Sequence, residues 1–177
     1  MNEQIKIIDN FLEKSDLQKI LTTIESPFFP WYYYPFVDEH TKEELEDKRK
    51  FQFVHTFYAS IGNNINMSDT YEIIKPIVNK LNPSTLIRIK INLLTNQSEL
   101  MQNNFHTDFQ HKKDYENMKT AIFYVNTNNG KTIFENGQTV DSVANRVVIF
   151  PANLKHTGTT CTDKKTRVVI NFNYYVW

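Results

Sequence analysis

Two side chains that can bind a metal stand two positions apart in residues 103–109, Asn-Asn-Phe-His-Thr-Asp-Phe. If this stretch is an extended strand, successive side chains alternate between faces, so His106 and Asp108 share one face. The other face would then pack on the core through Phe105, Thr107 and Phe109. An imidazole and a carboxylate on one face can hold a divalent metal, and His156 is the candidate third ligand. Two histidines and one carboxylate form the ligand set of non-haem Fe(II) sites that use O₂.

The residues that follow His156 extend this pattern. The segment His-Thr-Gly-Thr-Thr is followed by an apolar run that begins at Arg167, eleven positions after the histidine. A His-X-Asp pattern alone occurs by chance in many proteins, but here it stands with a distal histidine and an arginine. With these three features, residues 84–174 resemble the Fe(II)/2-oxoglutarate-dependent dioxygenases. The resemblance is greatest to the prolyl-hydroxylase-like branch, which is found among other places in phages.

The resemblance implies a ligand set and a reaction. His106, Asp108 and His156 would bind Fe(II), and the cosubstrates 2-oxoglutarate and O₂ would take the open metal positions. Oxidative decarboxylation to succinate and CO₂ would then accompany hydroxylation of a C–H bond in a peptidyl or small-molecule substrate. Arg167 would clamp the distal carboxylate of 2-oxoglutarate, because its planar guanidinium can donate two parallel hydrogen bonds.

The same resemblance suggests further cosubstrate contacts. Tyr124 corresponds to a position whose phenol often helps to hold 2-oxoglutarate, and Asn92 and Thr132 are candidates for the lining of the same pocket. One position departs from the pattern. Relatives usually carry a tyrosine just before the loop that leads to His-X-Asp, where this chain has Leu94. Leu94 has no hydroxyl, so it cannot make the hydrogen bond that the tyrosine would make. This difference affects how the cosubstrate is held and whether the substrate is a prolyl residue.

The position of Arg167 also has a geometric rationale. If residues 160–163 form a four-residue turn, His156 and Arg167 lie opposite each other on antiparallel strands and share a face. Val169 and Asn171 would lie on that face too, and Val168, Ile170 and Phe172 would pack behind it. A buried arginine without an acidic neighbour needs an anion, which 2-oxoglutarate would supply.

The elements that position these residues form one domain of 177 residues, in which 1–83 support a core formed by 84–177. The first half predicts a strand at 5–8, a helix capped by Ser15 that ends near Ser26, a strand at 51–58 and a second helix that ends at Leu81. The second half predicts short strands, with hairpin turns at Asn129-Gly130 and Asn136-Gly137. We therefore expect a mainly β protein with N-terminal helices. The resemblance specifies a double-stranded β-helix, the jelly-roll or cupin-like core.

Two other stretches of the first half bear on access to the site. Residues 31–36, Trp-Tyr-Tyr-Tyr-Pro-Phe, are interpreted as a strand that packs on the core, with a substrate-stacking surface as the alternative. Residues 38–50 carry ten charged side chains, which is typical of a solvated loop or short helix. We expect this charged segment to be mobile and to border the cavity entrance. His55 is expected to be a structural histidine.

The composition limits the classes of partner that this protein is expected to bind. Lys plus Arg and Asp plus Glu number 20 each, so no strong basic field favours nucleic acid. The single cysteine, Cys161, rules out an intrachain disulfide framework and suits a reducing compartment. No signal pattern and no apolar run of about 20 residues is present, so no membrane partner is expected. We expect a cytoplasmic protein, in the host cytoplasm if the source is viral.

Three alternative functions stay open from the sequence. A nucleic-acid demethylase would use the same iron chemistry, but that branch carries a second arginine six residues after the first, where this chain has Asn173. A cupin-type binding or isomerase barrel usually presents His-X-His with a nearby glutamate, whereas this chain has Asp108. A non-catalytic jelly-roll module would carry no stoichiometric iron. The identity of the substrate and the oligomeric state stay open as well.

Overall fold

A large antiparallel sheet and a small one make up most of the computed structural model, which describes residues 5–37, 41–108 and 117–177. In chain order the strands are β1 (Lys6–Ile8), β2 (Tyr32–Tyr34), β3 (Gln52–Ile61), β4 (Asn64–Met67), β5 (Thr85–Thr95), β6 (Met118–Tyr124), β7 (Lys131–Phe134), β8 (Thr139–Asp141), β9 (Arg146–Pro151), β10 (His156–Gly158) and β11 (Thr166–Tyr175). The helices are α1 (Lys14–Ile24), α2 (Lys42–Glu46), the 3₁₀ helix η1 (Tyr71–Ile74) and α3 (Lys75–Leu81).

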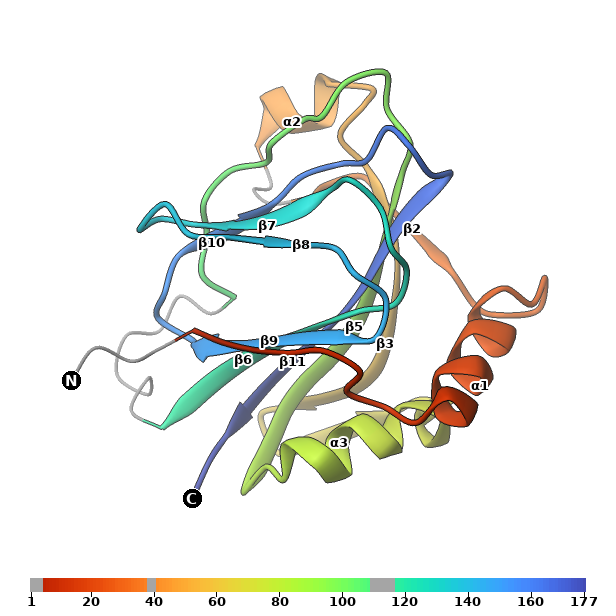
Figure 1. Ribbon diagram of the computed structural model, residues 1–177, viewed down its shortest axis with the longest axis vertical. Coiled ribbons are helices and arrows are strands. Elements are labelled where there is room, and N and C mark those ends of the chain that lie inside the picture. The colour runs from red at the N-terminus through yellow and green to blue at the C-terminus, as the bar shows by residue number, and fades with distance from the viewer. Residues whose placement is uncertain (1–4, 38–40, 109–116) are drawn as a thin grey trace.

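The two sheets face each other. The large sheet has the strand order β1-β9-β6-β11-β5-β3-β2, with β4 paired to β3, and the small sheet has the order β10-β7-β8. In Figure 1 the small sheet lies above β9 and β6 of the large sheet, while α3 lies below the large sheet and α1 lies to its lower right. This mainly antiparallel arrangement is consistent with the jelly-roll core that the sequence predicted. Strands β1, β2 and β3 come from the predicted supporting half but belong to the large sheet.

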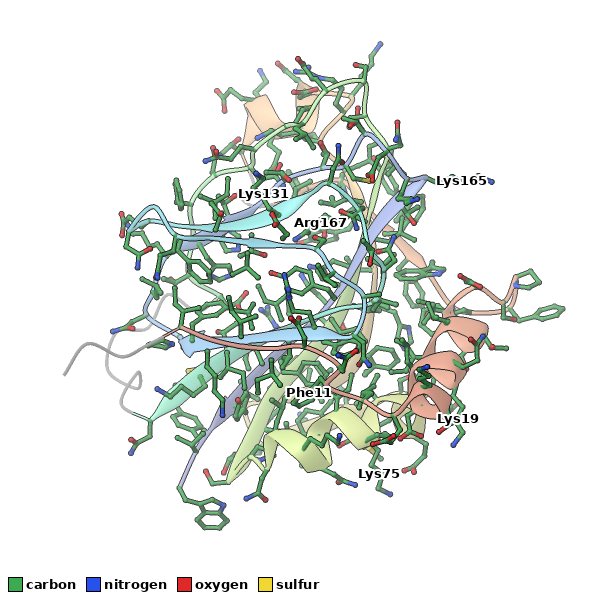
Figure 2. The ribbon with its side chains drawn as sticks, in the orientation of Figure 1. Phe11, Lys19, Lys75, Lys131, Lys165 and Arg167 are labelled. Carbon is green, nitrogen blue, oxygen red and sulfur yellow. The ribbon has the colours of Figure 1, made fainter. Side chains whose placement is uncertain are left out.

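Two apolar cores follow from the alternation along β11. Val168, Ile170 and Phe172 pack in the core that also contains residues of α1, η1 and α3. Val169, on the opposite face, packs in a smaller core between the two sheets. The faces of β11 are therefore those expected from its sequence, and the helices cover one face while the small sheet covers the other. Side chains of the helices and the sheet are drawn in Figure 2.

Helix boundaries differ in detail from the sequence predictions. Helix α1 begins at Lys14 with Glu13 as the N-cap residue, and no side chain caps it. The predicted Ser15 cap is therefore wrong, because Ser15 lies inside the first turn. The second predicted helix is divided into η1 and α3, with Pro76 in the first turn of α3, where its missing N–H costs nothing. None of the helices in the described residues is long and apolar enough to cross a membrane.

One predicted hairpin is wrong and the other is confirmed. Asn129-Gly130 does not join paired strands, because β6 pairs with β9 and β11 whereas β7 pairs with β8 and β10. A glycine is needed at 130 for a different reason. A Cβ atom there would lie 2.7 Å from Cδ of Arg167. The turn at Gly137, where φ is 85°, does join β7 to β8.

Asn145 fastens the N-terminal segment to the large sheet. Its Oδ1 accepts a hydrogen bond from Leu12 N at 2.7 Å, and its Nδ2 donates to Leu12 O at 2.8 Å. Its own φ is 64°, in the left-handed region that asparagine tolerates better than most residues.

We expect Asn145→Ala to lower the free energy of unfolding by about 3 kcal/mol. Two buried hydrogen bonds contribute about 1 kcal/mol each, and alanine at positive φ costs about 1 kcal/mol more. Asn145→Gly is the matched control, because glycine adopts this backbone without strain and should lose only about 2 kcal/mol. Urea unfolding of the metal-free protein measures both, and a loss below 1 kcal/mol in the alanine variant would contradict this account.

Candidate active site

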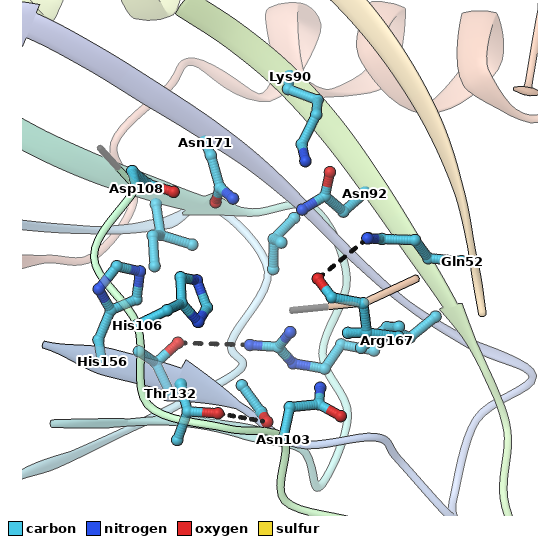
Figure 3. A pocket seen from close by; sticks show the side chains of 16 residues that line it. Gln52, Lys90, Asn92, Asn103, His106, Asp108, Thr132, His156, Arg167 and Asn171 are labelled. Carbon is cyan, nitrogen blue, oxygen red and sulfur yellow. Dashed lines mark hydrogen bonds between the residues drawn. The ribbon is translucent and has the colours of Figure 1, made fainter. Parts of the chain in front are cut away.

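The three predicted metal ligands come together between the two sheets. Ligand atoms of His106, Asp108 and His156 all lie within 4.8 Å of one another. His106 and His156 are paired in an isolated antiparallel bridge, with backbone N···O distances of 3.0 Å in both directions. Figure 3 shows the two imidazoles and the carboxylate at one side of a shared cavity. Two nitrogens and one oxygen at this separation fit one divalent metal ion.

The segment that carries His106 and Asp108 is not the regular strand that the sequence predicted. Within 102–108 only two isolated bridges form, Gln102 with Thr159 and His106 with His156. Phe105 is 39% exposed, so its predicted place in the core is wrong. Phe109 lies outside the described residues. His106 and Asp108 nevertheless both line the cavity.

Each histidine is oriented by a backbone carbonyl. His106 Nδ1 lies 3.1 Å from Asn104 O, and His156 Nδ1 lies 3.3 Å from Leu154 O. A carbonyl can only accept a hydrogen bond, so each Nδ1 carries the proton and each Nε2 carries a lone pair. Burial lowers the pKa of His156, with Asp108 acting in the opposite direction, so the imidazole is neutral at neutral pH. This tautomer suits metal binding through Nε2.

The Asp108 carboxylate is held by three donors from three strands of the large sheet. Arg88 Nη2 donates to Oδ1 at 3.1 Å, and Asn173 Nδ2 and Thr120 Oγ1 donate to Oδ2 at 2.7 and 3.3 Å. Burial alone would raise the pKa of Asp108, but the charge of Arg88, helped by the hydrogen bond from Asn173, outweighs it and holds the pKa well below its usual range. The group is therefore ionised. A carboxylate offers about four lone-pair sites, so one is left for a metal.

Arg167 reaches the same cavity by a route that the sequence did not predict. It stands opposite Leu94 of β5, while His156 stands opposite Phe134 of β7. The predicted pairing of His156 with Arg167 on adjacent strands is therefore wrong. The two residues belong to different sheets, and they line one cavity because the sheets face each other.

The Arg167 guanidinium is buried without an acidic partner. Nε donates to Ser142 Oγ at 3.0 Å and Nη2 to Thr132 Oγ1 at 3.4 Å. Among the described residues no carboxylate ion-pairs with it, and Nη1 makes no hydrogen bond. Burial lowers the pKa of Arg167, yet an arginine remains protonated in proteins. Gly158 permits the close packing, since a Cβ atom there would lie 3.3 Å from Nη1. Such a buried cation fits an anionic ligand.

The other predicted cosubstrate residues divide into two groups. Asn92 and Thr132 line the cavity with Leu94, the residue at the usual tyrosine position. Tyr124 is fully buried behind Thr132 and does not line the cavity. Its hydroxyl donates to Thr132 Oγ1 at 2.7 Å, so the structure places it as a support for Thr132. Burial, as the largest cause, raises the pKa of Tyr124, so the phenol keeps its proton.

A wide groove adjoins the cavity. The cavity has a volume of about 80 Å³ and the groove about 1670 Å³. Both are lined by the same five residues at their junction, Val37, Gln52, Lys90, His106 and Asp108. Tyr32 and Tyr34 also line the groove, and Tyr32 is 61% exposed. The predicted strand is present as β2 and Trp31 packs against the larger core, while Tyr32 and Tyr34 line the groove, so both interpretations of residues 31–36 fit part of the stretch.

The first half of the chain contributes to the groove in two further ways. Thr41, within the charged segment, lines the groove, and Thr41 Oγ1 caps α2. Residues 38–40 lie outside the described residues, so the expected mobility of the charged segment 38–50 stays a prediction. His55 is structural, as expected. Its Nδ1 lies 3.1 Å from Pro30 O and its Nε2 lies 2.9 Å from Ser68 Oγ.

Sequence reasoning missed three polar residues of the site, Arg88, Lys90 and Asn173, whereas Asn171 lines the cavity on the face that was expected for it. On β5, Arg88, Lys90 and Asn92 alternate with isoleucines, which places the three polar residues on one face. That alternation was a usable signal. It does not distinguish a polar face in water from a polar face that lines a cavity.

Comparison with known proteins gives a fold match but no sequence match. A scan against protein-family models and a search of curated proteins each found nothing. An oxidoreductase of the 2OG-Fe(II) oxygenase family from Burkholderia pseudomallei has a TM-score of 0.68 at 9% identity, over 97% of this chain and 84% of that chain. A prolyl hydroxylase from Trichoplax adhaerens, in complex with a hypoxia inducible factor peptide fragment, has a TM-score of 0.64 at 14% identity. The match covers 98% of this chain and 84% of that chain. A non-heme alpha ketoglutarate dependent carbocyclase from nogalamycin biosynthesis has a TM-score of 0.67 at 10% identity. The match covers 98% of this chain and 79% of that chain.

The chain therefore has the fold of the 2OG-Fe(II) oxygenases, prolyl hydroxylases among them. This confirms the superfamily fold that the sequence motifs indicated. Of the matched proteins, one was solved with a peptide and another is a carbocyclase. The fold is thus shared by proteins that differ in substrate, and the choice of reaction depends on the site residues.

Proposed function

We propose that this protein is an Fe(II)- and 2-oxoglutarate-dependent dioxygenase that hydroxylates a C–H bond of a peptidyl or small-molecule substrate. One observation carries the proposal. A two-histidine, one-aspartate group and a buried arginine without a carboxylate partner line the same cavity. The metal group fits Fe(II), and the arginine fits the distal carboxylate of 2-oxoglutarate.

The roles of the chain's own residues follow from their contacts. His106, Asp108 and His156 would hold the iron, which supplies the means to activate O₂. Arg88, Asn173 and Thr120 would keep the Asp108 carboxylate ionised and oriented. Arg167 would fix the far end of 2-oxoglutarate, with Thr132 beside it as a hydroxyl partner. Asn92 lines the wall between these two ends of the cavity.

The contacts of Asn173 weigh against the demethylase alternative. That branch carries an arginine at this position, whereas here Asn173 is fully buried and bonded to Asp108, Thr120 and Arg88. The Asn173 side chain is thus bonded to Asp108, a proposed metal ligand, and position 173 supplies no cation to the groove.

The test is anaerobic titration of Fe(II) and then 2-oxoglutarate into the purified protein. We expect one Fe(II) per chain and, on addition of 2-oxoglutarate, the charge-transfer absorption that the resemblance to the superfamily predicts. On exposure to O₂, succinate should form. Glutarate, which has no keto oxygen to chelate the metal, is the matched control and should give no absorption. Iron-free protein that binds no 2-oxoglutarate would favour the non-catalytic jelly-roll alternative.

A further inference from the structure

Lys90 stands at the junction of the cavity and the groove and has no role in the proposed function so far. It lies on β5 between Arg88 and Asn92, on the same face of the sheet, opposite Asn171 of β11. It lines both the cavity and the groove, whereas Arg167 lines only the cavity. In Figure 3 the side chain enters from β5 on the side away from the two histidines.

The Lys90 ammonium has no counter-ion. In the part of the chain that the structure describes, no carboxylate lies within the 4.0 Å limit for an ion pair with Nζ, and Nζ makes no hydrogen bond. The acid that faces this region, Asp108, already accepts from Arg88, Asn173 and Thr120. Burial, followed by the charge of Arg88, lowers the pKa of Lys90 to about 8, against the opposite effect of Asp108. The ammonium is still the main form at neutral pH, and an anion would stabilise it.

Two buried acceptors beside Lys90 also have no partner. Oδ1 of Asn92 and Oδ1 of Asn171 are shielded from solvent and accept no hydrogen bond. Buried polar groups in folded proteins are nearly always satisfied, so both oxygens fit a ligand that brings N–H or O–H donors. The dianion of 2-oxoglutarate has only acceptors, because its carboxylates and keto oxygen carry no proton. The cosubstrate therefore cannot satisfy them, whereas a substrate that brings N–H or O–H groups can.

We propose that Lys90, with Asn92 and Asn171, recognises a substrate that carries a carboxylate next to an N–H donor, the chemistry of an acidic amino-acid residue. The inference rests on the proposed function, since it assigns the substrate of the same site. The carboxylate meets the Lys90 ammonium at the junction with the groove. The neighbouring N–H group donates to the amide oxygens of Asn92 or Asn171. Lys90 is thus a specificity-determining residue, and the remainder of the substrate lies in the groove.

The test compares two probes of the same shape that differ in charge, N-acetyl-aspartate methylamide and N-acetyl-asparagine methylamide. Each is titrated into protein loaded with Zn(II) and saturating 2-oxoglutarate, and binding is followed by NMR shifts of the β5 backbone amides. A charge-assisted hydrogen bond contributes about 1.5–3 kcal/mol, so the acidic probe should bind roughly 10- to 100-fold more tightly. Lys90→Gln should bring the ratio of affinities to about one, and Lys90→Arg should keep most of it.

Lys155→Gln is the matched control for general charge effects. Lys155 also lines the groove, but it is 53% exposed and lies 3.4 Å from Glu135, so its loss should leave the preference in place. Equal affinity of the two probes for the wild-type protein, no binding of either, or a preference that survives Lys90→Gln overturns the proposal. A lack of 2-oxoglutarate binding to the wild-type protein would instead count against the proposed function. The probe titration can then be repeated with Zn(II) alone. This measurement separates failure of the substrate proposal from failure of the proposed function.

Discussion

Asp108→Ala should weaken Fe(II) binding by more than about 100-fold and abolish turnover of 2-oxoglutarate. Loss of an outer hydrogen-bonding partner typically costs 10- to 100-fold in metal affinity, and loss of a direct ligand should cost more. The contacts of Asp108 add a second effect. Without the carboxylate, the charge of the Arg88 guanidinium, which now lies 3.1 Å from Oδ1, would no longer be offset by an anion at position 108. In the Asp108→Ala variant, the attraction between the carboxylate and Fe(II) is lost and the repulsion between Arg88 and Fe(II) remains.

The measurement is an anaerobic Fe(II) titration against a competing chelator, with circular dichroism as a check on folding. The double variant Asp108→Ala, Arg88→Ala is the matched control, because it removes the repelling cation together with the ligand. It should bind Fe(II) more tightly than Asp108→Ala alone, though more weakly than wild type. Wild-type affinity in Asp108→Ala would remove Asp108 from the ligand set.

Arg167→Ala should weaken 2-oxoglutarate binding by roughly 30-fold or more and leave Fe(II) binding nearly unchanged. The guanidinium is buried, and the described residues supply it with hydroxyl partners but no carboxylate. Removing one member of a buried charge-assisted pair costs about 2–5 kcal/mol, and 1.4 kcal/mol corresponds to tenfold in affinity. Fe(II) binding should be nearly unaffected because the hydrogen bonds of Arg167 go to Ser142 and Thr132 and not to a proposed metal ligand.

Titration of 2-oxoglutarate into the anaerobic Fe(II) protein measures the effect through the charge-transfer absorption. Arg167→Met retains much of the apolar stem and removes the charge, so it separates loss of charge from loss of packing beside Gly130 and should resemble the alanine variant. Arg167→Lys should recover part of the affinity, because the charge survives but the planar fork does not. Unchanged affinity in both neutral variants would show that another residue holds the carboxylate.

The residue types of the site could be predicted from sequence better than their geometry. His106, Asp108, His156 and Arg167 were found by type and spacing, and the structure places all four around one cavity. Their strand pairing was not predictable from local pattern. Strand β11, which carries Arg167, pairs with β5 and β6, and both are distant from it in sequence. The isolated bridges of the 102–108 segment leave no alternation of buried and exposed residues to detect.

The wrong hairpin and the missed lysine have the same physical origin. Asn129-Gly130 has the composition of a tight turn, but its glycine is required by the side chain of Arg167, which is remote in sequence. Lys90 has the composition of a solvent-facing strand residue, but the small sheet and the 102–108 segment cover that face. In both cases a contact between distant parts of the chain decides the role of a residue whose local pattern is ordinary.

The way the three proposed ligands are anchored has a consequence for the life of the protein in a cell. His156 belongs to the small sheet, Asp108 is bonded to three strands of the large sheet, and His106 lies on a segment attached by isolated bridges. A bound ion would therefore join the small sheet, the large sheet and the 102–108 segment at one point. A ligand that binds only the folded state stabilises that state in proportion to its concentration and affinity. Under iron starvation the unfolded fraction would rise and proteases would remove it, so the abundance of this protein is expected to follow iron supply as well as its rate of synthesis.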